Sequence, residues 1–285
     1  MYYDITNPNA SYSWLCETLK VNEEELIGDY IIECHSDPNE FYERYRAVIE
    51  KIDIENLEIV AFQVTSNDNQ CDDIKRNGLH NLQWVLSNDT VLNKYLKQYK
   101  ISFDLGKKLL YIDGYVYDIA YERYKDLDLI SNRKKQLHDI GQKIYYDFQI
   151  NAFLFCEDIY KYSTIHEAPE FLFTLSNMNS HTNELYETWK NSCEAYVVKF
   201  KAKLKEFEYY TFYDSKTEYE EDKQANLIML RKQLVSRALK SMMGNSTSEI
   251  YAYMKPNTVI IPENIIKYVS AKEWRKNVLK YFEKG

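Results

Sequence analysis

The sequence is poor in glycine and proline and has no long apolar run. Its 285 residues include 7 glycines and 5 prolines beside 27 tyrosines, which resembles the residue usage of an AT-rich genome, as in many low-GC bacteria and their phages. No apolar run approaches the roughly 18 residues that a membrane-spanning helix requires, and the N-terminus lacks the basic and apolar regions of a secretory signal. We therefore expect a cytoplasmic protein without a membrane segment.

Cysteine pairs and metal-ligand spacings are also lacking. The five cysteines are scattered, odd in number and never in a C-x-x-C pair, so neither a disulfide framework nor a zinc site is indicated. The five histidines have no metal-ligand spacing either. We expect a reducing compartment and no bound metal. The cysteines are Cys16, Cys34, Cys71, Cys156 and Cys193.

The net charge of −8 argues against a general nucleic-acid binder, because phosphate binding requires a positive surface. Two short basic stretches, residues 132–136 and 199–205, have acidic residues nearby and are typical of solvated faces. The tyrosines are spread along the chain rather than gathered into one base-stacking segment. With 45% apolar and 28% charged residues, the composition is that of a folded globular protein.

Apolar spacing divides the chain into a helical beginning and a mixed remainder. Residues 10–20, 22–35 and 37–52 each have the periodicity of a helix. The run "LEIVAFQVT" (57–65) is rich in β-branched residues and predicts the first strand. We therefore divide the chain into an N-terminal helical segment, residues 1–56, and an α+β domain, residues 57–285.

The remainder alternates helices with strands without a βαβ rhythm. It predicts short helices between residues 72 and 100, a hairpin turning at Asp113-Gly114, and helices over 131–148, 169–178 and 184–192. Strands are predicted at 151–155, 195–204, 248–254 and 257–261, the last two paired, and the last helix at 218–242, with a helical turn at 262–269. These elements favour an α+β fold with a mainly antiparallel sheet, an N-terminal helical layer and flanking helices.

The common catalytic motifs are missing. The chain has no G-x-x-x-x-G-K-[ST], H-E-x-x-H, G-x-S-x-G or G-x-G-x-x-G sequence. A His and Glu pair in "HEAPEFL" (166–172) is explained by a helix that starts after Pro169 with an acidic residue in its first turn. Trp189, Tyr196 and Tyr145 are interpreted as core residues. The usual phosphate-loop, zinc-protease and serine-hydrolase scaffolds are therefore not indicated.

One segment resembles a known family. "FQVTSNDNQCDDIKRNGL" (62–79) is similar to the opening signature of ADP-ribosyltransferase-like proteins, especially DNA-targeting toxins and related bacterial and phage proteins. In that family a strand ending in H-x-T is followed by a polar loop and a short helix with an apolar-x-x-x-Gly-Leu finish. Here the strand carries Gln63-Val64-Thr65, and the finish runs from Ile74 to Gly78-Leu79.

A second segment fits the same resemblance. "TSEIYAYMKPNTVIIPENIIKYV" (247–269) resembles the family's final strands, which implies that Glu249 is the catalytic carboxylate. The resemblance implies NAD as the substrate, with Gln63 and Thr65 binding its nicotinamide or ribose. A carboxylate in that position orients the ribose hydroxyls, stabilises the oxocarbenium ion and activates the acceptor. The implied role lies in a toxin or phage-defence system, on a protein or nucleic-acid target that the sequence does not identify.

The chain departs from the family at one position and leaves other readings open. The family's usual histidine is Gln63, which can donate a hydrogen bond but cannot titrate. The alternative is a non-enzymatic binding or inhibitor protein that keeps the scaffold and contacts a protein partner through its acidic surface. In a purely structural interpretation, Gln63 and Thr65 belong to a strand end that is capped by a turn, and Glu249 is an exposed residue at the start of a strand.

Overall fold

The computed structural model describes residues 2–124, 130–222, 226–244 and 249–282. In this part of the chain, six strands form a central sheet in the order β8-β6-β2-β7-β9, with β1 beside β2. All pairs are antiparallel except β1 with β2, which gives the α+β fold that the sequence predicts. The strands are β1 (Tyr2–Tyr3), β2 (Glu58–Asn67), β6 (Asn151–Cys156), β7 (Glu194–Lys203), β8 (Glu249–Tyr253) and β9 (Ile265–Ser270).

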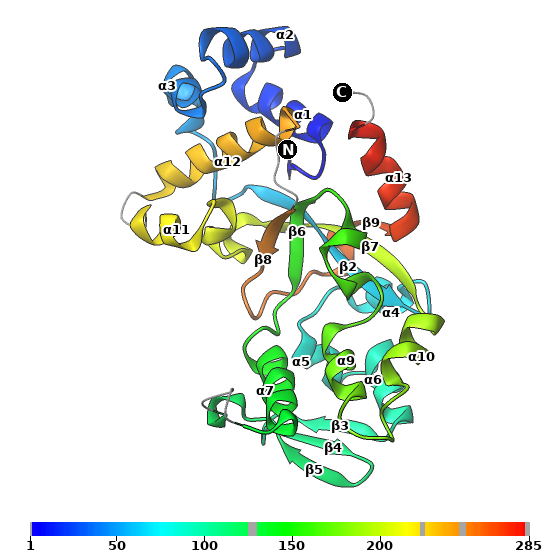
Figure 1. Cartoon of the computed structure of the whole chain (residues 1–285). Helices are drawn as coiled ribbons and strands as arrows, with labels where there is room; N and C mark the ends of the chain where they lie inside the picture. Colours follow the sequence, from blue (N-terminus) through cyan, green and yellow to red (C-terminus); the bar gives the residue numbers. More distant parts are fainter. Residues whose placement is uncertain (1, 125–129, 223–225, 245–248, 283–285) are drawn as a thin grey trace.

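The N-terminal segment is helical, as predicted, and covers one face of the sheet (Figure 1). Asn7 and Asn22 accept backbone N–H groups at the starts of its first two helices, which satisfies donors left free at a helix end. Helices α1 and α3 of this segment pack with α12, and the segment shares the largest hydrophobic core with the sheet. The elements are α1 (Pro8–Leu19), α2 (Glu23–Ile27), the π-helix η1 (Gly28–Glu33), α3 (Pro38–Ile49) and α12 (Asn226–Met242).

Strand β2 lies in the middle of the sheet and buries both faces. Ile59 and Ala61 belong to the largest core. Phe62 and Val64, which alternate with them, belong to a smaller core on the opposite face. Because side chains alternate along a strand, Gln63 lies on the same face as Ile59 and Ala61. The predicted first strand is thus confirmed and extends to Asn67.

A second group of elements packs beyond one end of the central sheet, around its own hydrophobic core (Figure 1). The predicted hairpin is confirmed: Asp113 (φ 48°) and Gly114 (φ 85°) form the turn of a three-stranded sheet, where two positive φ values favour a type I′ turn. The elements around this core are α5 (Leu82–Ser87), α6 (Val91–Gln98), β3 (Ile101–Asp104), β4 (Leu109–Ile112), β5 (Tyr115–Asp118), α7 (Asn132–Tyr145), α9 (Glu170–Ser176) and α10 (Leu185–Ser192). Two short helices pack on the cores of the central sheet instead: α4 (Asp72–Asn77) on the largest core and α8 (Ile159–Tyr162) on the smaller one.

The C-terminal part differs from the prediction. Residues 257–261 do not pair with β8; within them Ile260 exchanges both backbone hydrogen bonds with Leu79, at 2.8 and 3.0 Å. The predicted helical turn at 262–269 is instead a short 3₁₀ turn, η7 (Pro262–Asn264), followed by β9, which pairs with β7. Local sequence could not reveal either partner, because both lie far away along the chain.

The helices near the C-terminus also differ from the prediction. The predicted last helix over 218–242 corresponds to α11 (Lys216–Asp222) and α12, with residues 223–225 outside the described part. A further helix, α13 (Ala271–Phe282), follows β9 and was not predicted. Within the described residues, no helix has the length and apolar character needed to cross a membrane.

Candidate ligand-binding cavity

A cavity of about 620 Å³ lies at the end of the central sheet where β2 and β8 finish and β6 begins. Its walls come from that sheet end, from the segment spanning α4 to α6, and from α7, α9 and α10. Small-molecule sites typically occupy roughly 300–1,000 Å³ and combine apolar walls with a few polar groups. The size and position of this cavity fit such a site.

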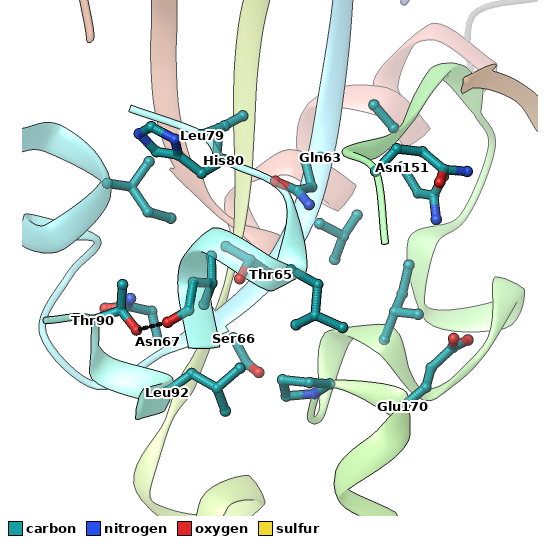
Figure 2. A pocket seen from close by; sticks show the side chains of 18 of the residues that line it. Gln63, Thr65, Ser66, Asn67, Leu79, His80, Thr90, Leu92, Asn151 and Glu170 are labelled. Atoms are coloured by element: carbon teal, nitrogen blue, oxygen red, sulfur yellow. Dashed lines mark hydrogen bonds between the residues drawn. The ribbon is translucent and has the colours of Figure 1, made fainter. Parts of the chain in front are cut away.

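Gln63 and Thr65, the two binding residues predicted from the sequence, both line the cavity. Figure 2 shows Leu79, His80 and Thr90 on one side of these β2 residues and Asn151 and Glu170 on the other. The end of β2 therefore forms part of the cavity wall between two groups of side chains from distant segments.

The turn after β2 is held by Asn67 and Asp73. The Asn67 Oδ1 atom accepts the backbone N–H groups of Asn69 and Cys71, each at 2.9 Å. Its Nδ2 atom donates to Asp73 Oδ1 at 3.0 Å, and Asp73 Oδ2 accepts the Val91 N–H at 3.2 Å. Asp73 is buried, and a buried carboxylate is tolerated when it is fully hydrogen-bonded. These bonds fix α4 to the start of α6 beside the cavity.

Gly78 lets the chain pass close to Ile260. It follows the last residue of α4 and adopts φ 82° and ψ −168°. A Cβ atom at this position would lie 2.0 Å from the Ile260 carbonyl oxygen. Only glycine fits this close approach with a positive φ. The close approach to Ile260 thus explains the glycine at position 78, and both Gly78 and Leu79 line the cavity.

His80 and Trp84 form a stacked pair that sequence reasoning missed. Their rings lie parallel, with centroids 3.6 Å apart and an interplanar angle of 12°, and both line the cavity. The His80 Nε2 atom donates to the Asn77 carbonyl oxygen at 2.8 Å, since a carbonyl can only accept. In the neutral ring, Nδ1 is therefore the nitrogen that can accept a hydrogen bond. The sequence offered one sign of this pair: His80, just before α5, and Trp84, within α5, are four residues apart.

Charged side chains on the facing wall were also missed. Lys143 Nζ lies 2.7 Å from Asp147 Oδ2 and 3.1 Å from Glu170 Oε2, and all three line the cavity. Burial lowers the pKa of Lys143, but the hydrogen bond and charge of Asp147 and the charge of Glu170 outweigh it, so the pKa is raised. Asp147 Oδ1 accepts from Asn151 Nδ2 at 2.7 Å. Glu170 had been interpreted only as an acidic residue in the first turn of a helix.

Glu249, the predicted catalytic carboxylate, starts β8 and pairs with Cys156 at the end of β6 away from the cavity. It lies roughly 13 Å along the strand from Tyr253, which lines the cavity. Alternation places Glu249, Tyr251 and Tyr253 on the sheet face opposite to Gln63. Glu249 is not among the described residues that line the cavity.

The half-buried Glu249 has an electrostatic neighbour in Cys156. Burial is the main reason that the pKa of Cys156 rises to about 12, and the negative charge of Glu249 adds to it. The structure therefore brings Gln63 and Thr65 together at the cavity and puts Glu249 beside a neutral thiol at the opposite end of the strands.

The remaining candidates from the sequence have structural roles. Trp189 is 2% exposed, and its indole Nε1 donates to Ser66 Oγ at 2.8 Å, which confirms it as a core residue. Tyr145 is partly buried and donates to the Leu105 carbonyl at 3.0 Å. Tyr196 is half-buried and packs against the largest core. His166 contacts the Ser163 carbonyl through Nδ1 at 3.0 Å.

Comparisons with known proteins give no match. No protein-family model, no curated protein and no solved structure has significant similarity to the chain. Among the residues that the structure describes, no group of three or more His, Cys, Asp or Glu side chains is arranged to hold a metal ion. The chemistry of the cavity itself therefore has to support any functional assignment.

Proposed function

We propose that the chain is an ADP-ribosyltransferase-like protein that takes NAD as its substrate and binds it in the cavity at the end of β2. The observation that carries this proposal is the position of the resembling segment. Gln63, Thr65, Gly78 and Leu79, which carry the resemblance, all line one cavity of suitable size. The segment is thus a ligand-facing part of the molecule as well as an ordinary turn.

The polar groups of the cavity suit a ribose and an amide. The Gln63 side chain offers both a donor and an acceptor, and the Thr65 hydroxyl offers both as well. When NAD is cleaved at the bond between nicotinamide and ribose, positive charge develops on the ribose, and a nearby carboxylate stabilises it. Such a carboxylate would supply the chemistry that the non-titrating Gln63 cannot.

Glu249 is the carboxylate that the resemblance assigns to this step. Its side chain is on the same face of β8 as Tyr251 and Tyr253, which line the cavity. A dinucleotide bound in the cavity would have to extend past Tyr251 to reach it. Three carboxylates line the cavity, Asp73, Asp147 and Glu170. Asp73 is buried in the turn after β2, so Asp147 and Glu170 are the natural comparison in any test of catalysis.

We place this activity in the cytoplasm of a bacterium, in a toxin, phage-defence or phage system, with a protein or nucleic acid as the modified target. A second candidate is a non-enzymatic binding or inhibitor protein on the same scaffold. It is favoured by glutamine at position 63 and by the distance of Glu249 from the cavity end of β8. Only the first candidate requires the cavity to bind and turn over NAD, because the second contacts its protein partner through the acidic surface.

The test incubates the purified protein with labelled NAD and cell lysate. Wild type is expected to transfer label or release nicotinamide, and Glu249→Ala is expected to do neither, while Glu55→Ala, at an exposed position away from the cavity, behaves as wild type. Loss of turnover in Asp147→Asn or Glu170→Gln, with Glu249→Ala active, would move the catalytic role into the cavity.

Calorimetry of NAD binding separates the two candidates. NAD binding without turnover by wild type favours the non-enzymatic protein. If wild type shows no turnover and no NAD binding, the proposed function is contradicted. Gln63→Ala is expected to weaken NAD binding by about two- to twelvefold, as the loss of one net hydrogen bond of about 0.5–1.5 kcal/mol implies.

A further inference from the structure

Three tyrosine rings form a continuous surface on one side of the cavity. Tyr251 and Tyr253 lie on the same face of β8, with ring centroids 5.7 Å apart and an interplanar angle of 30°. Tyr162 meets Tyr251 edge to face at 5.7 Å. Phe153 extends this surface, with its ring 4.9 Å from Tyr162. All four residues line the cavity, so a bound ring would find aromatic faces on this side.

Two carboxylates stand beside these rings and share a single cation. Asp147 and Glu170 both contact Lys143 Nζ, and Lys143 is the one Lys or Arg among the described residues that line the cavity. Asp147 and Glu170 are 39% and 49% exposed in their side chains, so each keeps oxygen surface for another partner. This side of the cavity therefore has an excess of negative charge and no uncommitted cation for a phosphate.

The carboxylates and the rings act on each other electrostatically. Burial is the main cause that raises the pKa of Tyr253, and the charge of Asp147 contributes to it. Burial is also the largest cause that raises the pKa of Tyr162. Its hydrogen bond with Tyr251 comes second, and the charge of Glu170 makes a smaller contribution. The hydroxyls of Tyr162 and Tyr253 therefore stay protonated at neutral pH, and these two rings remain neutral with electron-rich faces next to carboxylates.

We propose that this acidic aromatic wall, made of Tyr162, Tyr251, Tyr253, Asp147 and Glu170, is a subsite for an organic cation carried on a planar ring. The faces of aromatic rings attract ammonium and pyridinium charge, and the effect grows when the site is desolvated. Asp147 and Glu170 add direct attraction for the same charge. The cation comes either from the pyridinium ring of NAD⁺, which rests on the proposed function, or from a free N-alkylated heterocycle.

We expect a cationic ligand to bind more tightly than a neutral ligand of similar shape. In calorimetric titrations, 1-methylnicotinamide, a cation, is expected to bind at least about threefold more tightly than neutral nicotinamide. Glu170→Gln removes charge at a half-exposed position, and Tyr251→Leu removes an aromatic face; each is expected to reduce the preference to less than twofold. Glu187→Gln, an exposed acidic residue on α10, is the matched control and keeps it.

Equal binding of the two compounds, or binding of neither, would overturn the proposal. So would a preference that survives in both variants, provided that near-ultraviolet circular dichroism shows both to be folded. Because Glu170 is half exposed, Glu170→Gln keeps the test informative even if Tyr251→Leu does not fold.

Titrations with NAD⁺ and NADH identify the source of the cation and separate this inference from the proposed function. If NAD⁺ binds more tightly than NADH and Glu170→Gln removes the difference, the pyridinium ring of NAD⁺ occupies the wall. If 1-methylnicotinamide is preferred but neither dinucleotide binds, the wall takes a free cation, and the proposed function fails alone. If NAD⁺ and NADH bind equally and 1-methylnicotinamide shows no preference, the cation subsite fails alone.

Discussion

At the scale of single residues, hydrogen bonds between buried side chains hold the end of β2 in place beside the cavity. Ser66 illustrates this: it is 5% exposed at the end of β2, and its hydroxyl accepts the indole N–H of Trp189. The bond joins the central sheet to α10 next to the predicted binding residues Gln63 and Thr65. A buried donor without a partner loses its solvation without replacement.

Ser66→Ala is therefore expected to lower the free energy of unfolding by about 1–3 kcal/mol, because the Trp189 indole stays buried without an acceptor. Urea denaturation followed by tryptophan fluorescence measures the change. Ser192→Ala provides the control, since that exposed hydroxyl bonds only to backbone carbonyls of its own helix and to a neighbouring thiol. An equal effect in both variants would show that the indole bond has no special weight.

At the scale of elements, local sequence predicted what local interactions determine. The turn at Asp113-Gly114 was found because two positive φ values need these residue types. The helix starting after Ser131 was found because its apolar residues share one face. The pairing of Ile260 with Leu79 was missed, because the two residues are distant in sequence and only the folded chain brings them together.

The same difference between local and distant interactions explains which residues of the candidate site the sequence identified. Gln63 and Thr65 lie in one short segment with a recognisable pattern, so the sequence identified them. The contact of Lys143 with Asp147 and Glu170 joins the region of α7 with the start of α9, and sequence periodicity does not predict such a contact. Glu249 was placed by a resemblance that says which strand carries it and nothing about where that strand begins relative to the cavity.

Gly78→Ala tests the close approach of the segment after α4 to Ile260. The added Cβ would meet a backbone oxygen at 2.0 Å in a residue with φ 82°, so the free energy of unfolding is expected to fall by about 2 kcal/mol or more. Gly28→Ala is the matched control. Nothing lies within 4 Å of its Cβ position in a helix, and it should gain about 0.5–1 kcal/mol.

Thermal and urea denaturation of both glycine variants provide the measurement. Similar stability of the two variants would mean that the chain near Gly78 adjusts freely, and that the contact with Ile260 does not fix this wall of the cavity.

At the scale of the whole molecule, the many tyrosines make stability depend on alkaline pH. Burial is the largest cause that raises the pKa of Tyr145, Tyr196, Tyr210 and Tyr213 to about 12, above the ordinary value of 10.0. Above pH 10 these groups lose protons in the unfolded chain while the folded chain keeps them. The unfolded state then binds fewer protons, so the free energy of unfolding falls as pH rises.

Stability should accordingly be unaffected by these groups below pH 10 and decrease between pH 10 and about 12. Denaturation midpoints measured across this range, with tyrosinate absorbance recorded in the same samples, check the prediction. If tyrosinate formed fully near pH 10 while the protein stayed folded, these side chains would be more accessible than the structure indicates.

Amide hydrogen exchange with and without NAD is the sharpest test of the proposal that the cavity beside the end of β2 binds NAD. We expect slower exchange with NAD in residues 63–67 and 78–84 and in residues 149–153 on the facing side, with no change in α1 or α3. Unchanged exchange in all three cavity segments at saturating NAD, or protection confined to other parts of the chain, would contradict it.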